Sequence, residues 1–479
     1  MEMTPRDESR LRDHDVPLVV DVDGTLVTGD LLVEGVARLI ATSPWKAFLL
    51  PWWLLRGRAA LKRRVAQAVP LSPAALPLNA EVVAEIEAAK RQNRPVWLAS
   101  GADEFAVARL TEFIDGAGCL ASDGSRNLVG KAKAEALVAR FGSRGFDYIG
   151  NHRHDLPVWR ESRLAIGVGV STGLVRELRA TGRNPKLLGG ATGDWRDWLY
   201  ALRPHQWTKN TLVFVPLLAA HEVDGQAWLF TLGVGAALCC CASGTYVFND
   251  LLDLPDDRQH PGKRQRPIAA GKVSPLPIAW LGMALVVGGV LAGFSLASAG
   301  GYLLLCYVVG TLGYSLWLKR RLFVDVVALA LLYVIRVGMG ATESAVISPW
   351  LLAFSLFVFL ALAVVKRQTE LVSAASVLPE SRRPYVGEDL GVMAALGAAS
   401  AFAAAVVLAL YIQSPDVAVR YSRPELLGLA CPVLIYWLGR LLLLANRGFV
   451  DHDPIVFALR DRTSWLVAWT MGGAVVGAS

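Results

Sequence analysis

The chain has 479 residues, of which 54% are hydrophobic and only 19% charged, and its formal net charge at pH 7 is +7. A chain of this length is expected to hold more than one domain, and its apolar, charge-poor composition indicates a membrane protein. The net charge is better explained by the cytoplasmic loops of such a protein than by binding to nucleic acid, so no nucleic-acid partner is expected. The six cysteines show no metal-type spacing and are expected to be small apolar core residues.

The apolar residues are distributed unevenly along the chain. Residues up to about 198 have the composition of a soluble protein, whereas long apolar runs alternate with short charged segments from about residue 210 onward. The N-terminus is polar and lacks the apolar core of a signal peptide, so the first domain is expected to stay in the cytoplasm. The sequence therefore predicts two domains, 1–195 and 196–479.

Three predicted strands of the first domain run into polar residues. The first, PLVVDVDGTLV, carries Asp21 and Asp23, the second, PVWLASGAD, carries Ser100, and the third, FDYIGNHRHD, leads to Asn151 and Asp155. Ligands bind at the carboxyl ends of parallel strands, so these side chains are expected to share one site. Two carboxylates spaced two residues apart can hold Mg²⁺ while one of them acts as a nucleophile.

In this order, with Lys131 and Lys133 between the second and third strands, the segments resemble the haloacid dehalogenase (HAD) superfamily of phosphohydrolases over most of residues 15–190. The resemblance implies an α/β, HAD-like (Rossmannoid) domain with a helical cap insert. It also implies a role for each polar residue: Asp21 as phosphate-accepting nucleophile, Asp23 as general acid/base, Ser100 as phosphate ligand, Lys133 (or, second, Lys131) as neutralising cation, and Asp21, Asp23, Asn151 and Asp155 around Mg²⁺.

One position departs from the family pattern. The last motif usually begins with Gly-Asp, and this chain has Gly150 followed by Asn151. An asparagine oxygen can still bind Mg²⁺, but it brings no negative charge, so the affinity for the metal should fall. The sequence leaves two alternatives open, an active phosphatase and an inert structural domain.

The insert between residues 31 and 95 has helical character and contains SPWKAFLLPWWLLRGRAALKRR. Its apolar part is too short to span a membrane and is interrupted by Pro51. Tryptophans next to several Arg and Lys residues suit a helix that lies in the membrane interface. A cap helix packed on its own domain is the alternative, and both hold if the cap faces the bilayer.

The second domain contains about nine apolar runs that could cross a membrane, which predicts an all-α, polytopic membrane domain. The predicted spans are 210–226, 227–248, 276–297, 300–317, 322–342, 349–365, 391–412, 425–446 and 463–479. Lys and Arg are concentrated in the segments 249–275, 318–322 and 366–390, and the positive-inside rule places these in the cytoplasm. The protein is therefore expected in the cell inner membrane, with its first domain and its charged loops on the cytoplasmic side.

The segment NDLLDLPDDRQHPGKRQRP begins at Asn249 and follows an apolar run directly. On a helix continued past the membrane edge, Asn249, Asp253 and Asp257 would share one face, with Asp250 beside them. Mg²⁺ bridging a diphosphate would compensate the repulsion between the carboxylates, and the basic block that follows could hold further phosphate groups. The alternative is a solvated loop whose charges pair with one another.

This segment resembles the first motif of the UbiA superfamily of intramembrane prenyltransferases, and the resemblance covers residues 200–479. The aspartate pair expected in a second motif is absent, because the corresponding stretch YSLWLKRRLFVDVVAL offers Tyr314, Lys319 and the single carboxylate Asp325. With RPHQWTKN and KRQTE, this departure is similar to the decaprenyl-phosphate phosphoribosyltransferase branch. Those enzymes join 5-phosphoribosyl-1-pyrophosphate (PRPP) to a polyprenyl phosphate and release pyrophosphate.

The resemblance assigns roles to a larger set of residues. It implies catalytic roles for Asp250, Asp253, Asp257, Lys319 and Asp325; Mg²⁺ binding for Asn249, Asp253 and Asp257; and substrate binding for Asn249, Arg258, Lys263, Arg264, Arg266, Tyr314, Lys209, Arg336, Lys366, Arg367 and Glu370. For Arg336 the alternative is a snorkelling side chain or a pair with Asp325. For Lys366 and Arg367 it is a topology signal, and His452 and Asp453 are expected to lie in a solvated loop.

Together the two resemblances suggest a bifunctional enzyme with Mg²⁺ as cofactor. The membrane domain would make polyprenyl-phosphoryl-5-phosphoribose, and the HAD-like domain would remove its 5-phosphate. Two other classes remain open: an aromatic-acceptor prenyltransferase with an inert HAD domain, and a non-catalytic membrane scaffold that binds lipid phosphates. The oligomeric state is not indicated by the sequence.

Overall fold

The computed structural model describes residues 16–123, 125–180, 184–190, 193–341, 348–374, 385–450 and 453–479. The chain forms two compact units: unit 1 comprises Met1–Leu202 and Tyr246–Leu281, and unit 2 comprises Arg203–Thr245 and Gly282–Ser479. The charged segment after residue 245 thus belongs with the N-terminal residues. This division differs from the predicted boundary at residue 195, which stays a prediction.

Unit 1 is built on a six-stranded parallel sheet in the order β3-β2-β1-β4-β5-β6. The strands are β1 (Leu18–Val20), β2 (Val96–Asp103), β3 (Gly118–Ser122), β4 (Asp147–Gly150), β5 (Ala165–Val168) and β6 (Lys186–Leu188). Successive side chains of a strand point to opposite faces, so Leu18 and Val20 join one buried apolar cluster and Val19 joins the other. The predicted α/β architecture of this part is confirmed.

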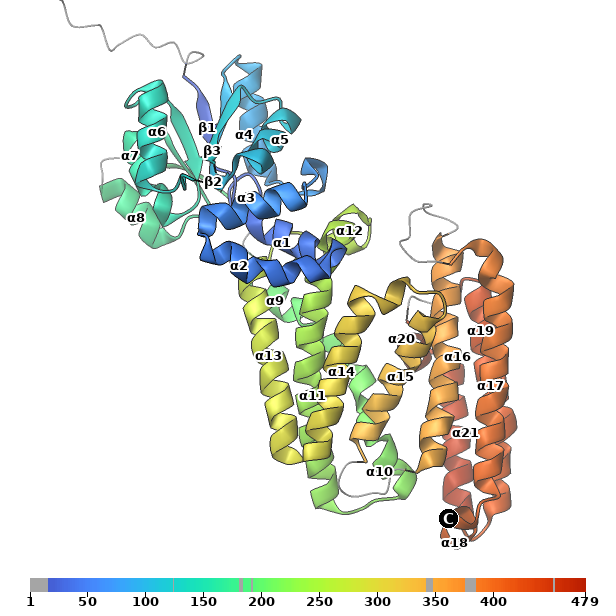
Figure 1. Ribbon diagram of the computed structural model, residues 1–479. Helices are drawn as coiled ribbons and strands as arrows, with labels where there is room; N and C mark the ends of the chain where they lie inside the picture. Colours follow the sequence, from blue (N-terminus) through green and yellow to red (C-terminus); the bar gives the residue numbers. More distant parts are fainter. Residues whose placement is uncertain are drawn as a thin grey trace, which may run out of the picture. The chain divides into compact units, whose positions relative to one another are not determined.

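Helices cover both faces of the sheet (Figure 1). Side chains of α4 (Ala80–Arg91) and α5 (Glu104–Phe113) pack on one face, and those of α6 (Lys131–Phe141), α7 (Leu156–Glu161) and α8 (Thr172–Ala180) pack on the other. The sheet is therefore buried on both sides, which explains why its strands read as nearly continuous apolar runs.

The insert after β1 forms a helical hairpin. Its legs are α1 (Leu31–Thr42) and α3 (Arg58–Ala68), and its tip consists of a 3-10 turn, Pro44–Leu49, and the short helix α2 (Leu50–Leu55). Asp30 begins α1 by accepting hydrogen bonds from the backbone N–H groups of Leu32 and Val33. The insert is thus helical, as predicted.

The remaining elements of unit 1 surround the aspartate-rich segment. They are α9 (Trp195–Ala201), the end of α11 (Gly225–Leu252), α12 (Leu254–Gln259), a 3-10 turn at Lys263–Gln265 and the start of α13 (Pro275–Leu296). The predicted continuous helix is interrupted at Asp253, whose backbone angles leave the helical region. Pro255 explains the interruption, because proline lacks a backbone N–H and restricts the residue before it.

Unit 2 is helical throughout its described residues. After a 3-10 stretch at Pro204–Phe214, its helices are α10 (Val215–Ala220), the larger parts of α11 and α13, α14 (Ser298–Leu316), α15 (Val324–Met339), α16 (Pro349–Ala374), α17 (Leu390–Ile412), α18 (Pro415–Arg420), α19 (Ala430–Asn446), α20 (Pro454–Arg460) and α21 (Arg462–Ala478). Its largest buried apolar cluster joins α15, α16, α17 and α19. The all-α prediction for this part is confirmed.

Six helices in the described part of the chain are long and apolar enough to cross a membrane, so the prediction of about nine is not confirmed. The six are Gly225–Leu252, Pro275–Leu296, Ser298–Arg320, Pro349–Val372, Gly387–Ile412 and Pro424–Asn446. The run 210–226 is divided between the 3-10 stretch and the six-residue α10. The other two, α15 and α21, have 16 and 17 residues, which is below the roughly 20 that a membrane span needs.

Candidate active sites

The first site lies at the carboxyl end of β1 and is centred on Asp21. The Lys133 ammonium lies 2.8 Å from Asp21 Oδ1 and 3.4 Å from Asp155 Oδ1, and all three side chains are buried. Thr25 Oγ1 donates a hydrogen bond of 3.2 Å to Asp21 Oδ2. The structure therefore joins residues that are far apart in the sequence into one cluster of two carboxylates around one cation.

Asp155 is held from several directions. Its Oδ1 accepts a hydrogen bond of 2.8 Å from the Tyr148 hydroxyl, and its Oδ2 accepts from the backbone N–H groups of Asn151 and His152 at 3.2 and 3.1 Å. The Lys133 ammonium also donates to the Tyr148 hydroxyl at 3.1 Å. Tyr148 was not expected from the sequence, because an aromatic residue inside a strand looks like an ordinary core residue.

Asp23 is bound on both carboxylate oxygens. Its Oδ1 accepts from the backbone N–H of Leu31 at 2.8 Å, and its Oδ2 accepts from Ser100 Oγ at 3.2 Å. Burial, with a smaller contribution from Asp30, raises the pKa of Asp23 to about 7. A carboxyl group with such a pKa holds a proton near neutral pH, as a general acid must.

The pKa values of Asp21 and Lys133 are both raised, but for different reasons. Burial raises the pKa of Asp21 to about 6, although the neighbouring Lys133 ammonium acts against it. Burial alone would lower the pKa of Lys133, but Asp21 and Asp155 outweigh it and raise that pKa above its ordinary value. Lys133 thus stays protonated, whereas Asp21 loses its proton near neutral pH and becomes able to attack an electrophile.

Asn151 and Lys133 lie beside the aspartates of this site, whereas Lys131 does not. Gly24 has φ of +72°, and a Cβ at this position would lie 2.2 Å from Asn151 Nδ2, so the asparagine side chain packs against the turn that carries Asp21 and Asp23. Lys131 is exposed at the start of α6, while Lys133 is buried in the cluster. Of the two lysines, only Lys133 contacts the carboxylates in the described structure.

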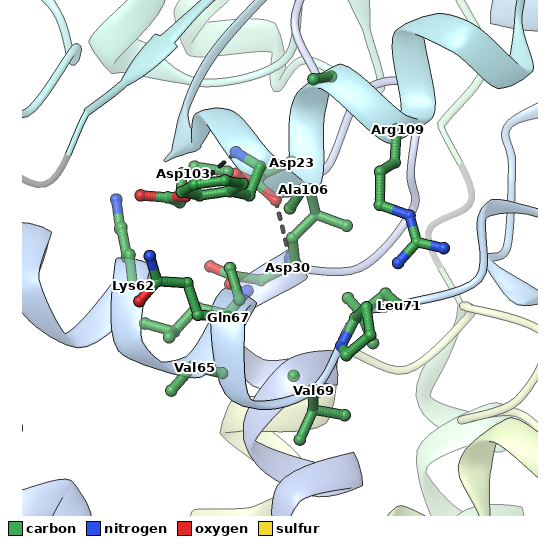
Figure 2. A pocket seen from close by; sticks show the side chains of 18 of the residues that line it. Asp23, Asp30, Lys62, Val65, Gln67, Val69, Leu71, Asp103, Ala106 and Arg109 are labelled. Atoms are coloured by element: carbon green, nitrogen blue, oxygen red, sulfur yellow. Dashed lines mark hydrogen bonds between the residues drawn. The ribbon is translucent and has the colours of Figure 1, made fainter.

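A cavity of about 530 Å³ opens beside Asp23 (Figure 2). Its walls come from α1, α3 and α5 and are mostly apolar. Lys62 and Arg109 bring positive charge to it, while Asp30 and Asp103 bring negative charge. The cavity is large enough for part of an organic phosphate ester, because small-molecule pockets begin at about 300 Å³.

The aspartate-rich segment forms a second cluster within unit 1. One amino group of Arg266 lies 3.1 Å from Asp250 Oδ1 and also bonds to Asp257 Oδ2. Burial, partly offset by Arg266, raises the pKa of Asp257 to about 6. The sequence predicts that Asn249, Asp253 and Asp257 share one helix face. Because the helix is interrupted at Asp253, Asp250 and Asp257 converge on one cation instead.

Arg258 has a partner outside this segment. Its two amino groups donate to the two carboxylate oxygens of Glu34 in α1, at 2.8 and 2.7 Å, and its Nε donates to the carbonyl oxygen of Ala269 at 3.1 Å. The two side chains are only 8% and 3% exposed. The role of Arg258 in substrate binding stays a prediction, and its observed contacts fix the segment to the helical insert (Figure 1).

The other predicted residues of the segment lie nearer its surface. Asn249 and Asp253 are half-buried, and the backbone N–H of Asp253 donates to the carbonyl oxygen of Asn249 at 2.9 Å. Lys263 and Arg264 are exposed in the short turn before Arg266. These two cations are accessible to a ligand from solvent.

In unit 2, Asp325 and Arg367 form a buried ion pair. Arg367 Nε lies 2.6 Å from Asp325 Oδ2, and neither side chain is more than 1% exposed. Arg367 also donates to the Tyr314 hydroxyl at 2.6 Å and bonds to Glu370. Four of the predicted residues thus form one connected network. Pairing is expected here, because a buried charged group is costly unless it has a counter-charge.

Tyr385 completes this network and was not expected from the sequence. Its hydroxyl donates to Asp325 Oδ1 at 2.6 Å and accepts from the backbone N–H of Phe323 at 2.9 Å. The alternative for Arg367, that it marks only the topology, does not explain its burial against Asp325.

Arg336 contacts other groups in unit 2. It donates to Asn210 Oδ1 at 3.3 Å, to the carbonyl oxygen of Leu332 at 2.8 Å and to the Tyr307 hydroxyl at 3.0 Å. Its guanidinium also lies 4.9 Å from the ring centre of Tyr333. The pair with Asp325 that the sequence left open does not form, because the two residues lie about 16 Å apart along α15. Asp325 pairs with Arg367 instead.

The remaining predicted cations of unit 2 are distributed over three helical segments. Lys209 is buried and forms an ion pair with Asp453, so the expectation that Asp453 lies in a solvated loop is wrong. Lys319 and Lys366 are half-buried, and His452 lies outside the described residues. Asp453 could not have been found from its sequence neighbours, since its partner is more than two hundred positions away.

The clusters of unit 1 can be tested for their fit to Mg²⁺. In the described part of the chain, no three His, Cys, Asp or Glu side chains lie close enough together to hold a metal ion by themselves. Two carboxylates nevertheless converge on one cation at each cluster. Mg²⁺ prefers one or two carboxylates completed by substrate oxygens and water, so both donor sets fit this ion.

Comparison with known proteins identifies the family. The model of the UbiA prenyltransferase family matches residues 211–448. The uncharacterized protein y4nM of Sinorhizobium fredii (strain NBRC 101917 / NGR234) is 34% identical over 472 residues, covering 97% of this chain and 91% of that protein. Decaprenyl-phosphate phosphoribosyltransferase of Mycolicibacterium smegmatis is 28% identical over 289 residues, covering 57% of this chain and 91% of the enzyme.

Among solved structures, phosphoserine phosphatase in its apo form covers 34% of this chain and 90% of its own, at 18% identity and a TM-score of 0.26. This TM-score is too low to support an argument. The HAD-like character of the N-terminal part is therefore inferred from its own sequence motifs and from the contacts around Asp21. The match over residues 211–448 includes the aspartate-rich segment and the Asp325–Arg367 pair. With the similarity to y4nM over nearly its whole length, these findings show that the chain belongs to the UbiA prenyltransferase family.

Proposed function

We propose that the membrane part of this protein transfers a 5-phosphoribosyl group from PRPP to a polyprenyl phosphate. The observation that carries the proposal is the convergence of Asp250 and Asp257 on Arg266 in the motif that resembles the first family motif. Decaprenyl-phosphate phosphoribosyltransferases among the relatives, including one that aligns over 91% of its length, support this substrate class. A reaction with three phosphate-bearing groups also suits the many cations of the segment.

In the proposed reaction, a phosphate oxygen of the lipid attacks C1 of the ribose. The bond between C1 and the pyrophosphate oxygen breaks, and pyrophosphate leaves with that electron pair. Asp250 and Asp257, together with Asn249 and Asp253, would hold Mg²⁺, which when bound would stabilise the charge of the departing pyrophosphate. Lys263 and Arg264, which are exposed to solvent, would bind phosphate oxygens.

The buried network of unit 2 has a proposed role in the same reaction. Arg367 holds Asp325 and Tyr314 in fixed orientations through its hydrogen bonds. Lys319, which follows the helix that carries Tyr314, would bind the lipid phosphate. A rigid set of side chains binds a reacting group in one orientation and so lowers the entropic part of the barrier.

We also propose that the N-terminal domain removes the 5-phosphate from the product of the transferase. The Asp21 carboxylate would attack phosphorus while the bond to the ribose 5-oxygen breaks, and Asp23 would donate a proton to that oxygen. Asp23 would then take a proton from the water that releases phosphate from Asp21. Lys133 would neutralise the transferred phosphate, because its ammonium already lies 2.8 Å from Asp21.

The geometry around Asn151 supports an active domain over an inert one. Asp155, Lys133 and Tyr148 keep a connected set of hydrogen bonds around Asp21. Asn151 packs against the catalytic turn at Gly24, where its carbonyl oxygen would help to hold Mg²⁺. In this proposal both sites face the cytoplasm at the inner membrane, and the transferase site takes soluble PRPP from there.

A product assay tests both activities together. Purified protein in detergent receives radiolabelled PRPP, a polyprenyl phosphate and Mg²⁺, and the lipid-soluble product is identified by mass. We expect lipid-linked ribose without the 5-phosphate from the wild type and lipid-linked 5-phosphoribose from Asp21→Asn. The matched control is Asp115→Asn, an exposed aspartate of the same domain, which should give the wild-type product.

The same assay separates the two halves of the proposal. Asp257→Asn should abolish all labelled lipid, while the neighbouring Asp256→Asn, which carries the same change of charge, should retain it. A wild type that forms only the phosphorylated product would refute the phosphatase half alone. A protein that labels no lipid from PRPP would refute the transferase half.

A further inference from the structure

The tip of the helical insert exposes an unusual number of large apolar side chains. We define the insert tip as residues 45–57, which comprise most of the 3-10 turn, α2 and the turn that follows. Trp45, Phe48, Trp52 and Leu55 are 64%, 86%, 57% and 82% exposed. Several large apolar side chains exposed on one short segment indicate a contact site for a partner or a membrane.

The charges around the insert tip restrict the kind of partner. Between residues 35 and 80 the sequence contains no Asp or Glu, and the cations Lys46, Arg56 and Arg58 lie in the tip or directly after it. Arg56 lies 5.4 Å from the ring centre of Trp52, and Lys46 lies 5.8 Å from that of Trp45. Tryptophan interleaved with Arg and Lys suits the headgroup region of a bilayer, where an apolar ring and a cation each find a favourable environment. Because these charges are all positive, anionic headgroups are favoured.

The base of the insert is fixed to the segment that connects two candidate membrane spans. Glu34, in the first turn of α1, forms the buried ion pair with Arg258 of α12. Arg258 lies in the segment between the end of α11 at Leu252 and the start of α13 at Pro275, and both helices are candidate spans. Since α1 has 12 residues and a helix rises about 1.5 Å per residue, the tip lies within roughly 20 Å of this attachment point along α1.

We propose that the insert tip binds the headgroup region of a bilayer that contains anionic phospholipids. Trp52 and Leu55 enter the boundary between headgroups and acyl chains, and Arg56 and Arg58 contact lipid phosphates. The proposal does not require the N-terminal domain to be active, because it concerns only the contact between the tip and the lipid.

One consequence rests on the proposed function. The two legs of the insert, α1 and α3, form walls of the cavity beside Asp23. A tip held in the headgroup region would keep this cavity near the surface where a lipid-linked sugar phosphate presents its phosphate. The phosphatase site would then receive its substrate from the membrane and not from solution.

Photo-crosslinking tests the contact without using activity. The photoreactive residue p-benzoylphenylalanine replaces Leu55 in the full chain, and in a matched control it replaces Leu187, an exposed leucine of β6 in the same unit. Both proteins are reconstituted in nanodiscs of phosphatidylcholine with and without phosphatidylglycerol, irradiated and analysed by mass. We expect at least about ten times more phospholipid adduct at position 55 than at position 187, with a further increase when phosphatidylglycerol is present.

The charges are tested with a second variant. Arg56→Gln combined with Arg58→Gln should remove the increase caused by phosphatidylglycerol and leave the adduct in phosphatidylcholine. Adducts at position 55 that join it to another segment of the protein, or a lipid yield no higher than at position 187, would overturn the proposal. Hydrolysis of a soluble phosphate ester, measured on the same samples, reports separately on whether the phosphatase site works.

Discussion

The two acidic clusters of unit 1 hold their cations in different ways. In the first, Lys133 is bound by Asp21 and Asp155, which belong to the same set of motifs and follow two neighbouring strands of one sheet. In the second, Arg266 is bound by carboxylates of its own segment, whereas Arg258 is bound by Glu34, more than two hundred positions away. The first cluster is a self-contained site, and the second depends on the N-terminal domain for part of its structure. This difference suggests that the fusion of the two parts is structural as well as chemical.

The largest expected effect tests the self-contained cluster. Lys133→Met should lower phosphatase activity by about 10³-fold or more, because it leaves Asp21 and Asp155 as buried like charges without a cation. Release of phosphate from a soluble ester measures the effect. Lys131→Met is the matched control, since Lys131 is exposed, and equal losses from the two variants would contradict the assignment of Lys133.

The dependence of the second cluster on the N-terminal domain is tested at Glu34. Glu34→Gln leaves the Arg258 guanidinium buried without its counter-charge, and breaking a buried ion pair in this way costs about 3–5 kcal/mol. We expect a lower thermal transition of the purified protein and a loss of transferase activity. Glu85→Gln, which removes half of the partly exposed pair with Lys186, should cost less than about 1 kcal/mol.

A double substitution sharpens this prediction. Glu34→Leu combined with Arg258→Met removes both buried charges, so it should restore much of the thermal stability lost in Glu34→Gln. If transferase activity returns together with stability, Arg258 acts through structure. If stability returns without activity, Arg258 has the substrate-binding role that the family resemblance implies.

A smaller effect is expected in the network of unit 2. Tyr385→Phe removes the hydroxyl that donates to Asp325 at 2.6 Å, which leaves a buried carboxylate with one fewer donor and should cost about 1–3 kcal/mol. The thermal transition and the transferase rate should both fall. Tyr436→Phe, on an exposed tyrosine of α19, is the control, and equal effects of the two changes would remove Tyr385 from the network.

The smallest effect is a pH dependence confined to the first cluster. Asp21 must be ionised to attack phosphorus, so activity should rise as pH increases through about 6. Asp23 must be protonated to assist the leaving oxygen, so activity should fall again above about 7. The expected profile of kcat/KM is a narrow bell, and Asp23→Asn should remove its alkaline limb along with most of the activity. A rate that stays constant from pH 7 to 9 would contradict the role of Asp23.

The sequence by itself indicated the fold classes, the family and the charged residues that meet in the first cluster. The apolar runs of the strands and the DxDGT motif are local signals, and parallel strands bring their carboxyl ends together whatever the loops between them do. The number of membrane spans was harder to predict, because apolar runs such as 322–342 do not reveal where a helix begins and ends. Pro255 in the sequence indicates an interruption of the helix. Which aspartates then contact one cation depends on the position of Arg266 in the folded chain.

Only the tertiary structure decided which charges pair. Glu34 with Arg258, Lys209 with Asp453 and Asp325 with Arg367 join residues 42 to 244 positions apart. The physical reason is that a buried charge requires a counter-charge within a few ångströms, but nothing in the sequence near a charged residue specifies which distant helix supplies it. The tyrosines at positions 148 and 385 were missed for the same reason, since a hydroxyl becomes informative only when its partner is known.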